Sequence, residues 1–158
     1  MSITDVGAQT TGKTENGLGV DMNLEVMTLP VADVDRAKAF YQSLGWRLDI
    51  DLVVSDEVRS VQFTPPHSGC SIQFGKGRTA AEPGSAQAMI LVVKDIDAAR
   101  GDLVNRGVDV SEVQEMKPPG FDAPGRSYFA RAAFSDPDGN GWELQEITTR
   151  LPGRTWED

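Results

Sequence analysis

The sequence repeats part of itself: VADVDRAKAFYQSLG, at residues 31–45, returns as VKDIDAARGDLVNRG, at residues 93–107, 62 residues further on. Each copy places an aspartate, Asp33 or Asp95, where the free amides at the start of a helix need a capping oxygen. Each copy also places a glycine, Gly45 or Gly107, where that helix should end. Matching caps at a constant spacing indicate a duplicated structural unit.

Strand-like runs surround each predicted helix. In the first copy they cover residues 23–31, 46–54, 58–64 and 70–74, separated by turn-forming residues. In the second copy an apolar run ends at Val93, and further runs cover residues 108–113, 128–134 and 142–147. A Gly- and Pro-rich linker joins the two copies at residues 76–86. We therefore predict an α+β fold made of two βαβββ modules.

The repeat also sets the expected domain organisation. A chain of 158 residues can bury one sizeable core, so we expect a single domain at residues 22–147, with modules at 22–75 and 87–147. Residues 1–21 are expected to form a polar N-terminal tail and residues 148–158 a C-terminal tail. The loop at residues 116–126, with three prolines and two glycines, is either a lid over a pocket or an exposed insertion without a role.

Composition excludes several classes of function. The formal net charge of −9 and the scattered basic residues argue against nucleic acid as a partner. No apolar run approaches the roughly 18 to 20 residues that span a bilayer, so no membrane partner is expected. The N-terminus lacks the pattern of a secretory signal, and we expect a cytoplasmic protein. A single cysteine, Cys70, and a single histidine, His67, exclude the common zinc frameworks.

Three segments resemble the glyoxalase/bleomycin-resistance/dioxygenase superfamily, also called vicinal oxygen chelate proteins. They are LPVADVDRAKAFYQSLGW in the first module, ILVVKDIDAARGDLVNRGV in the second, and AFSDPDGNGWELQEI near the end. The resemblance covers residues 22–147 and implies curved mixed sheets that form a cup, with the helices outside. It also implies a homodimer, because paired modules of this family often complete their cups across a subunit interface.

The resemblance also locates the metal-ligand positions of the family, which lie on the first and fourth strand of each module. They fall on Val26, Gln73, Ala88 and Glu143. Val26 and Ala88 have no donor atom, and two ligands without an imidazole hold Zn²⁺, Fe²⁺ or Ni²⁺ poorly. We expect no cofactor, unless Gln73 and Glu143 weakly hold a hard divalent cation such as Mg²⁺ or Ca²⁺. The spacing of Asp136, Asp138 and Asn140 matches the first ligand positions of an EF-hand calcium loop. The last position of such a loop needs an acid but is Ile147 here, so we predict a simple turn.

Because side chains alternate along a strand, these four positions also predict which residues line the cup. The lining is mainly apolar with a few polar groups, which suits a small organic ligand that is uncharged or aromatic. Arg131 could pair with Glu143 or bind an anionic substituent, or it could be an exposed strand residue or part of an interface salt bridge. The predicted ligand-binding residues are Val26, Thr28, Ala88, Ile90, Phe129, Arg131, Gln145 and, at the rim, His67.

Two hypotheses for the function remain open. In the first, the protein binds a small organic molecule without a metal and acts as a lyase or isomerase, with Glu143 as general acid or base and Gln73 orienting the substrate or holding an oxyanion. In the second, it is a drug-sequestering resistance protein that resembles the bleomycin-binding members and needs no catalytic residue. A metal-dependent glyoxalase or extradiol dioxygenase is disfavoured by Val26 and Ala88.

Overall fold

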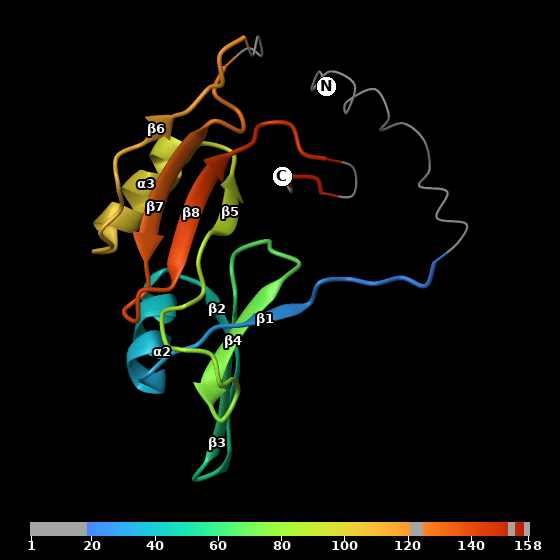
Figure 1. Ribbon diagram of the computed structural model, residues 1–158, viewed down its shortest axis with the longest axis vertical. Coiled ribbons are helices and arrows are strands. Elements are labelled where there is room, and N and C mark those ends of the chain that lie inside the picture. The colour runs from blue at the N-terminus through green and yellow to red at the C-terminus, as the bar shows by residue number, and fades with distance from the viewer. Residues whose placement is uncertain (1–18, 121–124, 152–153, 157–158) are drawn as a thin grey trace.

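The computed structural model describes residues 19–120, 125–151 and 154–156. It contains the two predicted βαβββ modules, which confirms the α+β fold and the duplication (Figure 1). The elements of the first module are β1 (Val26–Thr28), α2 (Val34–Ser43), β2 (Arg47–Ser55), β3 (Val58–Thr64) and β4 (Ser71–Lys76). Those of the second module are β5 (Met89–Val93), α3 (Ile96–Asn105), β6 (Gln114–Glu115), β7 (Ala130–Ser135) and β8 (Gly141–Glu146).

Each module forms one mixed four-stranded sheet. The strand orders are β1-β4-β3-β2 and β5-β8-β7-β6. In both sheets the first strand runs parallel to the fourth, and the other neighbours are antiparallel. Figure 1 shows the first sheet in the lower half of the molecule and the second in the upper half, with α2 close to the junction. The two modules therefore have the same topology.

The predicted helix caps are present. The Asp33 carboxylate accepts a hydrogen bond from the Arg36 amide at 3.0 Å, and the Asp95 carboxylate accepts one from the Ala98 amide at 3.1 Å. Gly45 and Gly107, which follow the helices, have φ values of 79° and 89°, a conformation that favours glycine. The repeated sequence therefore specifies both helices locally.

The strands β1 and β7 begin later than predicted, and β1 also ends earlier. Instead of residues 23–31, β1 holds only three residues, and residues 19–25 are exposed. Two hydrogen bonds mark the ends of the pairing between β1 and β4. The Ser71 amide donates to the Glu25 carbonyl before β1, and the Leu29 amide donates to the Gln73 carbonyl after it. Pro30 then has no N–H group with which to continue it. Similarly, β7 begins at Ala130 because the Ala130 amide donates to the Arg126 carbonyl in a turn, which leaves Phe129 outside the strand.

The strand predicted at residues 108–113 is absent, and a two-residue strand follows it instead. Val108 and Val110 are buried, so the alternating pattern that suggested a strand reflects burial in the core. The Arg100 side chain donates to the carbonyl oxygens of Val110 and Ser111 at 3.3 Å and 2.7 Å. A side chain therefore occupies carbonyls that a strand would offer to its neighbour.

Some predictions fall on residues outside the described ranges. These are residues 1–18 of the N-terminal tail, 121–124 of the loop at 116–126, and 152–153 and 157–158 of the C-terminal tail. A lid formed by the loop at 116–126 stays a prediction. Across residues 19–120, 125–151 and 154–156, no helix has the length and hydropathy needed to cross a membrane.

The core is continuous between the modules and centres on Tyr41 of α2. Its ring lies 5.3 Å from the ring of Trp46, 5.6 Å from that of Phe74 and 6.2 Å from that of Trp142, measured between centroids. Trp142 belongs to β8 of the second module, so an aromatic cluster spans the junction. Aromatic pairs at these separations stabilise a core beyond the area they bury.

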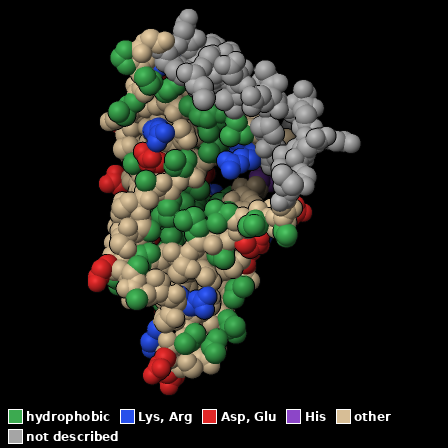
Figure 2. Space-filling model, turned by 45° about the vertical axis from the view of Figure 1, so that its right-hand side comes forward, with side chains coloured by type: hydrophobic (Ala, Val, Ile, Leu, Met, Phe, Trp, Pro, Cys, Tyr) green, Lys and Arg blue, Asp and Glu red, His purple; other side chains and the backbone are tan. Residues whose placement is uncertain are grey.

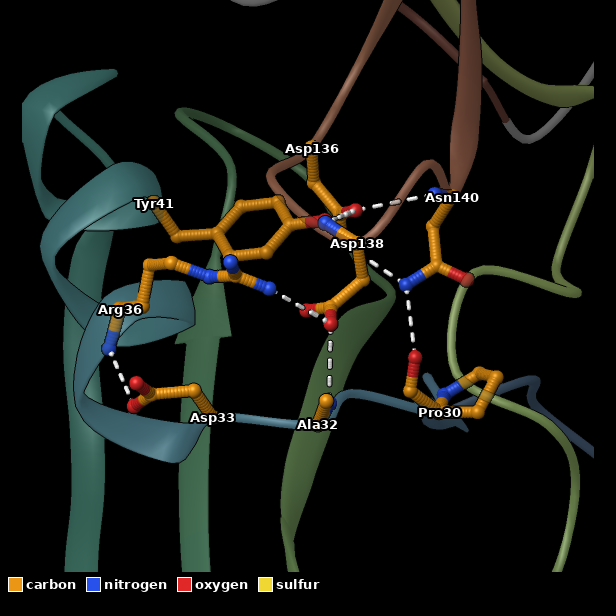
Figure 3. A network of polar contacts seen from close by, with 8 residues as sticks. All are labelled: Pro30, Ala32, Asp33, Arg36, Tyr41, Asp136, Asp138 and Asn140. Atoms are coloured by element: carbon orange, nitrogen blue, oxygen red, sulfur yellow. Dashed lines mark hydrogen bonds and ion pairs between the residues drawn. The ribbon is translucent and has the colours of Figure 1, made fainter.

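The turn at residues 136–140, which we call the inter-module turn, joins the modules through polar contacts (Figure 3). The buried Asp136 carboxylate accepts four hydrogen bonds, from the Tyr41 hydroxyl, the Asn140 side chain and the amides of Asp138 and Asn140, at 2.8–2.9 Å. Burial and the Asp136 charge raise the pKa of Tyr41 well above its usual range. The predicted turn is thus confirmed, and its buried carboxylate accepts hydrogen bonds from other groups of the protein.

The same turn also holds the chain that leads into α2. The Asn140 side chain donates to the Pro30 carbonyl at 2.9 Å, and the Asp138 carboxylate accepts from the Ala32 amide at 2.9 Å and from Arg36 at 3.0 Å (Figure 3). Residues of the second module therefore satisfy backbone groups of the first. This turn fixes how the two sheets are placed.

Replacing Asp136 with alanine should lower the free energy of unfolding by about 3 kcal/mol, because several buried donors then lose their acceptor. The matched control is Asp56→Ala in the exposed turn between β2 and β3, which should change stability by less than about 0.5 kcal/mol. Urea unfolding followed by circular dichroism measures both changes. Equal effects of the two substitutions would contradict a stabilising role for Asp136.

Candidate functional site

The candidate site lies on the inner faces of the two sheets, by which we mean the faces opposite α2 and α3. In β4, Ile72 and Phe74 are buried, so Ser71 and Gln73 lie on the inner face. In β8, Trp142 and Leu144 are buried in the same way, and Glu143 and Gln145 alternate with them. The side chains of Gln73 and Glu143 therefore face inward, as predicted.

Gln73 is held by two side chains on the inner face of the first module. Its Nε2 donates to the Thr28 hydroxyl at 2.8 Å, and its Oε1 accepts from an Arg78 guanidinium nitrogen at 3.2 Å. Thr28 is also the residue that faces Gln73 in the pairing of β1 with β4. Arg78 was not predicted, because it lies in the linker, where the strand pattern has ended.

A second polar group on this inner face, Asp49, was also missed. An irregularity between Leu48 and Ile50 interrupts the pairing of β2 with β3, and Asp49 lies within it. The Asp49 carboxylate accepts hydrogen bonds from the side chains of Thr64, Arg47 and Gln62. Burial alone would raise the pKa of Asp49, but these bonds outweigh it and lower the pKa below its usual range.

The inner face of the second module carries an ion pair. Arg131 donates to the Glu143 carboxylate at 3.2 Å, and their side chains are 38% and 32% exposed. This confirms one of the predicted alternatives for Arg131. Gln145 is buried, and its side chain donates to the Tyr128 carbonyl at 3.0 Å. Gln145 is therefore occupied by the protein, whereas Arg131 and Glu143 stay accessible to a ligand.

The remaining predicted residues are scattered around these groups. Ile90 faces Glu143 in the pairing of β5 with β8, and Val26 faces Ser71 in the pairing of β1 with β4. Ala88 precedes β5 with a φ of 58°, so the predicted first-strand position lies just outside the strand. His67 is exposed in the turn between β3 and β4, at the rim, and the half-buried Phe129 lies just before β7.

The inner faces are only partly covered. The exposed fractions of Ile50, Leu52 and Ile90 are 43%, 55% and 47%, which is high for large hydrophobic residues on a sheet. An open hollow also lies where α2 meets the second sheet, lined among others by Phe40, Ala133, Trp142, Glu143 and Ala88. On the face seen in Figure 2, hydrophobic side chains border a hollow that also has basic and His side chains at its edge, which the hollow beside α2 lacks. Within the described part of the chain, no hydrogen bond or ion pair joins Gln73 to Glu143.

The residues at the family's metal-ligand positions do not fit a divalent metal. The side chains of Val26 and Ala88 offer no donor atom, and Oε1 of Gln73 and Oε2 of Glu143 each accept a hydrogen bond from a guanidinium group. A guanidinium beside each oxygen repels a second cation. Over the three described ranges, no three His, Cys, Asp or Glu side chains are grouped so that they could hold a metal ion.

Comparison with known proteins relates the chain to one family. The profile of the Glyoxalase/Bleomycin resistance protein/Dioxygenase superfamily matches residues 23–144. TnmS3, an antibiotic binding protein from Streptomyces sp. CB03234, is 27% identical with a TM-score of 0.66, and the match covers 82% of this chain and 99% of that one. Curated protein sequences give no match.

Two further solved structures agree. A glyoxalase/bleomycin resistance protein from Streptomyces sp. CB03234 is 29% identical with a TM-score of 0.61, covering 78% of this chain and 99% of its own. A superfamily member from Sphaerobacter thermophilus DSM 20745 is 27% identical with a TM-score of 0.63, covering 80% and 98%. With the profile spanning most of its length, the chain belongs to the Glyoxalase/Bleomycin resistance protein/Dioxygenase superfamily.

Proposed function

We propose that the protein binds a small organic molecule on its inner faces without a metal, and that it works by capture. The observation that carries this proposal is the exposure of large apolar side chains beside a few oriented polar groups on those faces. An apolar surface with a small number of fixed hydrogen-bonding groups is the usual composition of a site for an organic ligand. The similarity to TnmS3, an antibiotic binding protein, supports an antibiotic-like ligand.

The pocket that we propose is completed by a second copy of the chain. One chain leaves Ile50 and Leu52 of β2 and Ile90 of β5 exposed, and exposed large apolar side chains of this kind often mark an interface. Among the described strands, β1 and β5 each end a sheet and so each have one edge without a strand neighbour. A homodimer that brings the inner face of one module against that of another would cover these groups and enclose a ligand.

Acid or base catalysis through Glu143 is the second candidate. Arg131 occupies Oε2 of Glu143, and the side chain is still 32% exposed, so Oε1 can reach a ligand proton. A lyase or isomerase reaction needs one such positioned carboxylate. Capture is favoured over catalysis because the ion pair with Arg131 already gives the carboxylate a structural partner.

Titration with a panel of antibiotics that includes bleomycin separates the two candidates. For capture, Glu143→Gln should change the dissociation constant by less than about threefold, because a neutral amide keeps the shape of the site. Tryptophan fluorescence measures the binding, and mass spectrometry shows whether the bound compound is recovered unchanged. A product that forms with the natural chain and disappears with Glu143→Gln would instead establish catalysis.

Elemental analysis of the purified protein tests the absence of a metal requirement. We expect far less than one transition-metal ion per chain, and ligand binding that EDTA does not alter, because only two side chains at the metal-ligand positions carry oxygen and neither is an imidazole. Added Ni²⁺ or Zn²⁺ should leave the affinity unchanged. Stoichiometric metal whose removal abolishes binding would contradict metal-independent binding.

Sedimentation velocity over a range of protein concentrations tests the homodimer. The natural chain should sediment as a dimer, and Ile90→Asp should shift it toward monomer, because a charge on the covered inner face must be desolvated. Val104→Asp is the matched control, since Val104 is similarly exposed but lies on α3. A natural chain that is monomeric at every concentration rules out a pocket completed by a second copy.

A further inference from the structure

The two oxygen-bearing side chains at the family's metal-ligand positions, Gln73 and Glu143, have the same kind of partner. Oε1 of Gln73 accepts from Arg78 at 3.2 Å, and Oε2 of Glu143 accepts from Arg131 at 3.2 Å. The two positions correspond in the repeated topology, since both lie on the fourth strand of a module and face inward. In a metal-dependent member, the side chain at each of these positions would point toward a cation. In each module of this protein, the side chain at this position points toward a guanidinium group instead.

The backbone around β4 directs Arg78 to this place. Gly77 has a φ of 71°, which turns the chain back after β4. The Arg78 stem then lies against Gly75, where an added Cβ would be 3.1 Å from the Arg78 Cγ and 1.8 Å from the Arg59 carbonyl oxygen. A larger residue at position 75 would displace both, so the glycine allows the side chain to lie along the strand toward Gln73.

The charges of the two guanidinium groups are compensated differently. Arg131 pairs with the Glu143 carboxylate, whereas the partner of Arg78 is a neutral amide. Among the described residues, no carboxylate forms an ion pair with Arg78, although most other arginines of the folded part have one. The acid on the same inner face, Asp49, is paired with Arg47. The inner face of the first module thus holds a positive charge that a ligand can neutralise.

We propose that Arg78, positioned by Gln73, binds an anionic group of the ligand in place of the divalent cation, and that Arg131 assists from the second module. The inference rests on the proposed pocket and narrows its ligand to an organic anion: an apolar body that carries a carboxylate, phenolate or sulfonate. A guanidinium has five N–H donors in a planar fork, and only one hydrogen bond of Arg78 is used by Gln73. The others are available to oxyanion oxygens.

A guanidinium in place of a metal ion also favours ligand binding over reactions that need a metal-activated water. A guanidinium stays protonated and has no open coordination position, so it cannot generate a hydroxide from bound water as a metal ion does. It can still hold and orient an anion through paired hydrogen bonds. A guanidinium in place of a metal ion therefore still attracts an oxyanion but does not activate water. These are the properties that a protein acting by capture needs.

A matched pair of fluorescent probes tests the proposal on the full-length protein. The two probes are 1-anilinonaphthalene-8-sulfonate and N-phenyl-1-naphthylamine, which share an apolar body and differ in the sulfonate. Arg78→Gln should weaken binding of the sulfonate probe at least about tenfold, the loss of one charge-assisted contact, and change binding of the neutral probe less than about twofold. Arg154→Gln, on the exposed C-terminal tail, removes the same charge elsewhere and should leave both probes unaffected.

The outcomes separate this proposal from the pocket itself. If neither probe binds the natural chain, the pocket on the inner faces is wrong. If both probes bind but Arg78→Gln weakens the sulfonate probe no more than Arg154→Gln does, the pocket stands and anion binding by Arg78 is wrong. If Arg78→Gln weakens both probes equally while circular dichroism shows an intact fold, Arg78 shapes the site and does not recognise an anion.

Discussion

The buried carboxylate of Asp136 determines how the two modules are placed. It accepts four hydrogen bonds, one of them from Tyr41 of the other module, and Trp142 donates to the same Tyr41 hydroxyl at 3.0 Å. A carboxylate removed from water is tolerable only when its oxygens are satisfied in this way. The Asp-Pro-Asp-Gly-Asn sequence, which could be mistaken for a cation-binding loop, therefore joins the two halves of the molecule.

This junction leaves the inner faces of both sheets free to carry function. The helices cover the opposite faces, and the aromatic cluster around Tyr41 supplies a rigid base beneath β4 and β8. Gln73 and Glu143 are presented from those two strands with their orientation fixed by Thr28, Arg78 and Arg131. Side chains held on packed strands are suited to recognise a ligand with little reorganisation.

Much of the fold could be predicted because its signals are local and repeated. Asp33, Asp95, Gly45 and Gly107 mark both helices without reference to the rest of the chain, and strand alternation placed Gln73 and Glu143 on the correct face. Arg78 and Asp49 could not be found in this way. Arg78 reaches the site through a backward turn at Gly77, and Asp49 through a strand irregularity, and neither feature has a periodic signature.

We propose that this member of the superfamily uses arginines where metal-dependent members would hold a cation. The most direct measurement is a crystal structure with 4-iodobenzoate, in which the anomalous signal of iodine locates the ligand. We predict iodine among the apolar side chains of an inner face, with the carboxylate about 3 Å from the guanidinium of Arg78. Iodine on the helical face, or a carboxylate bound to a metal ion beside Gln73 and Glu143, would contradict the replacement of the metal by arginine.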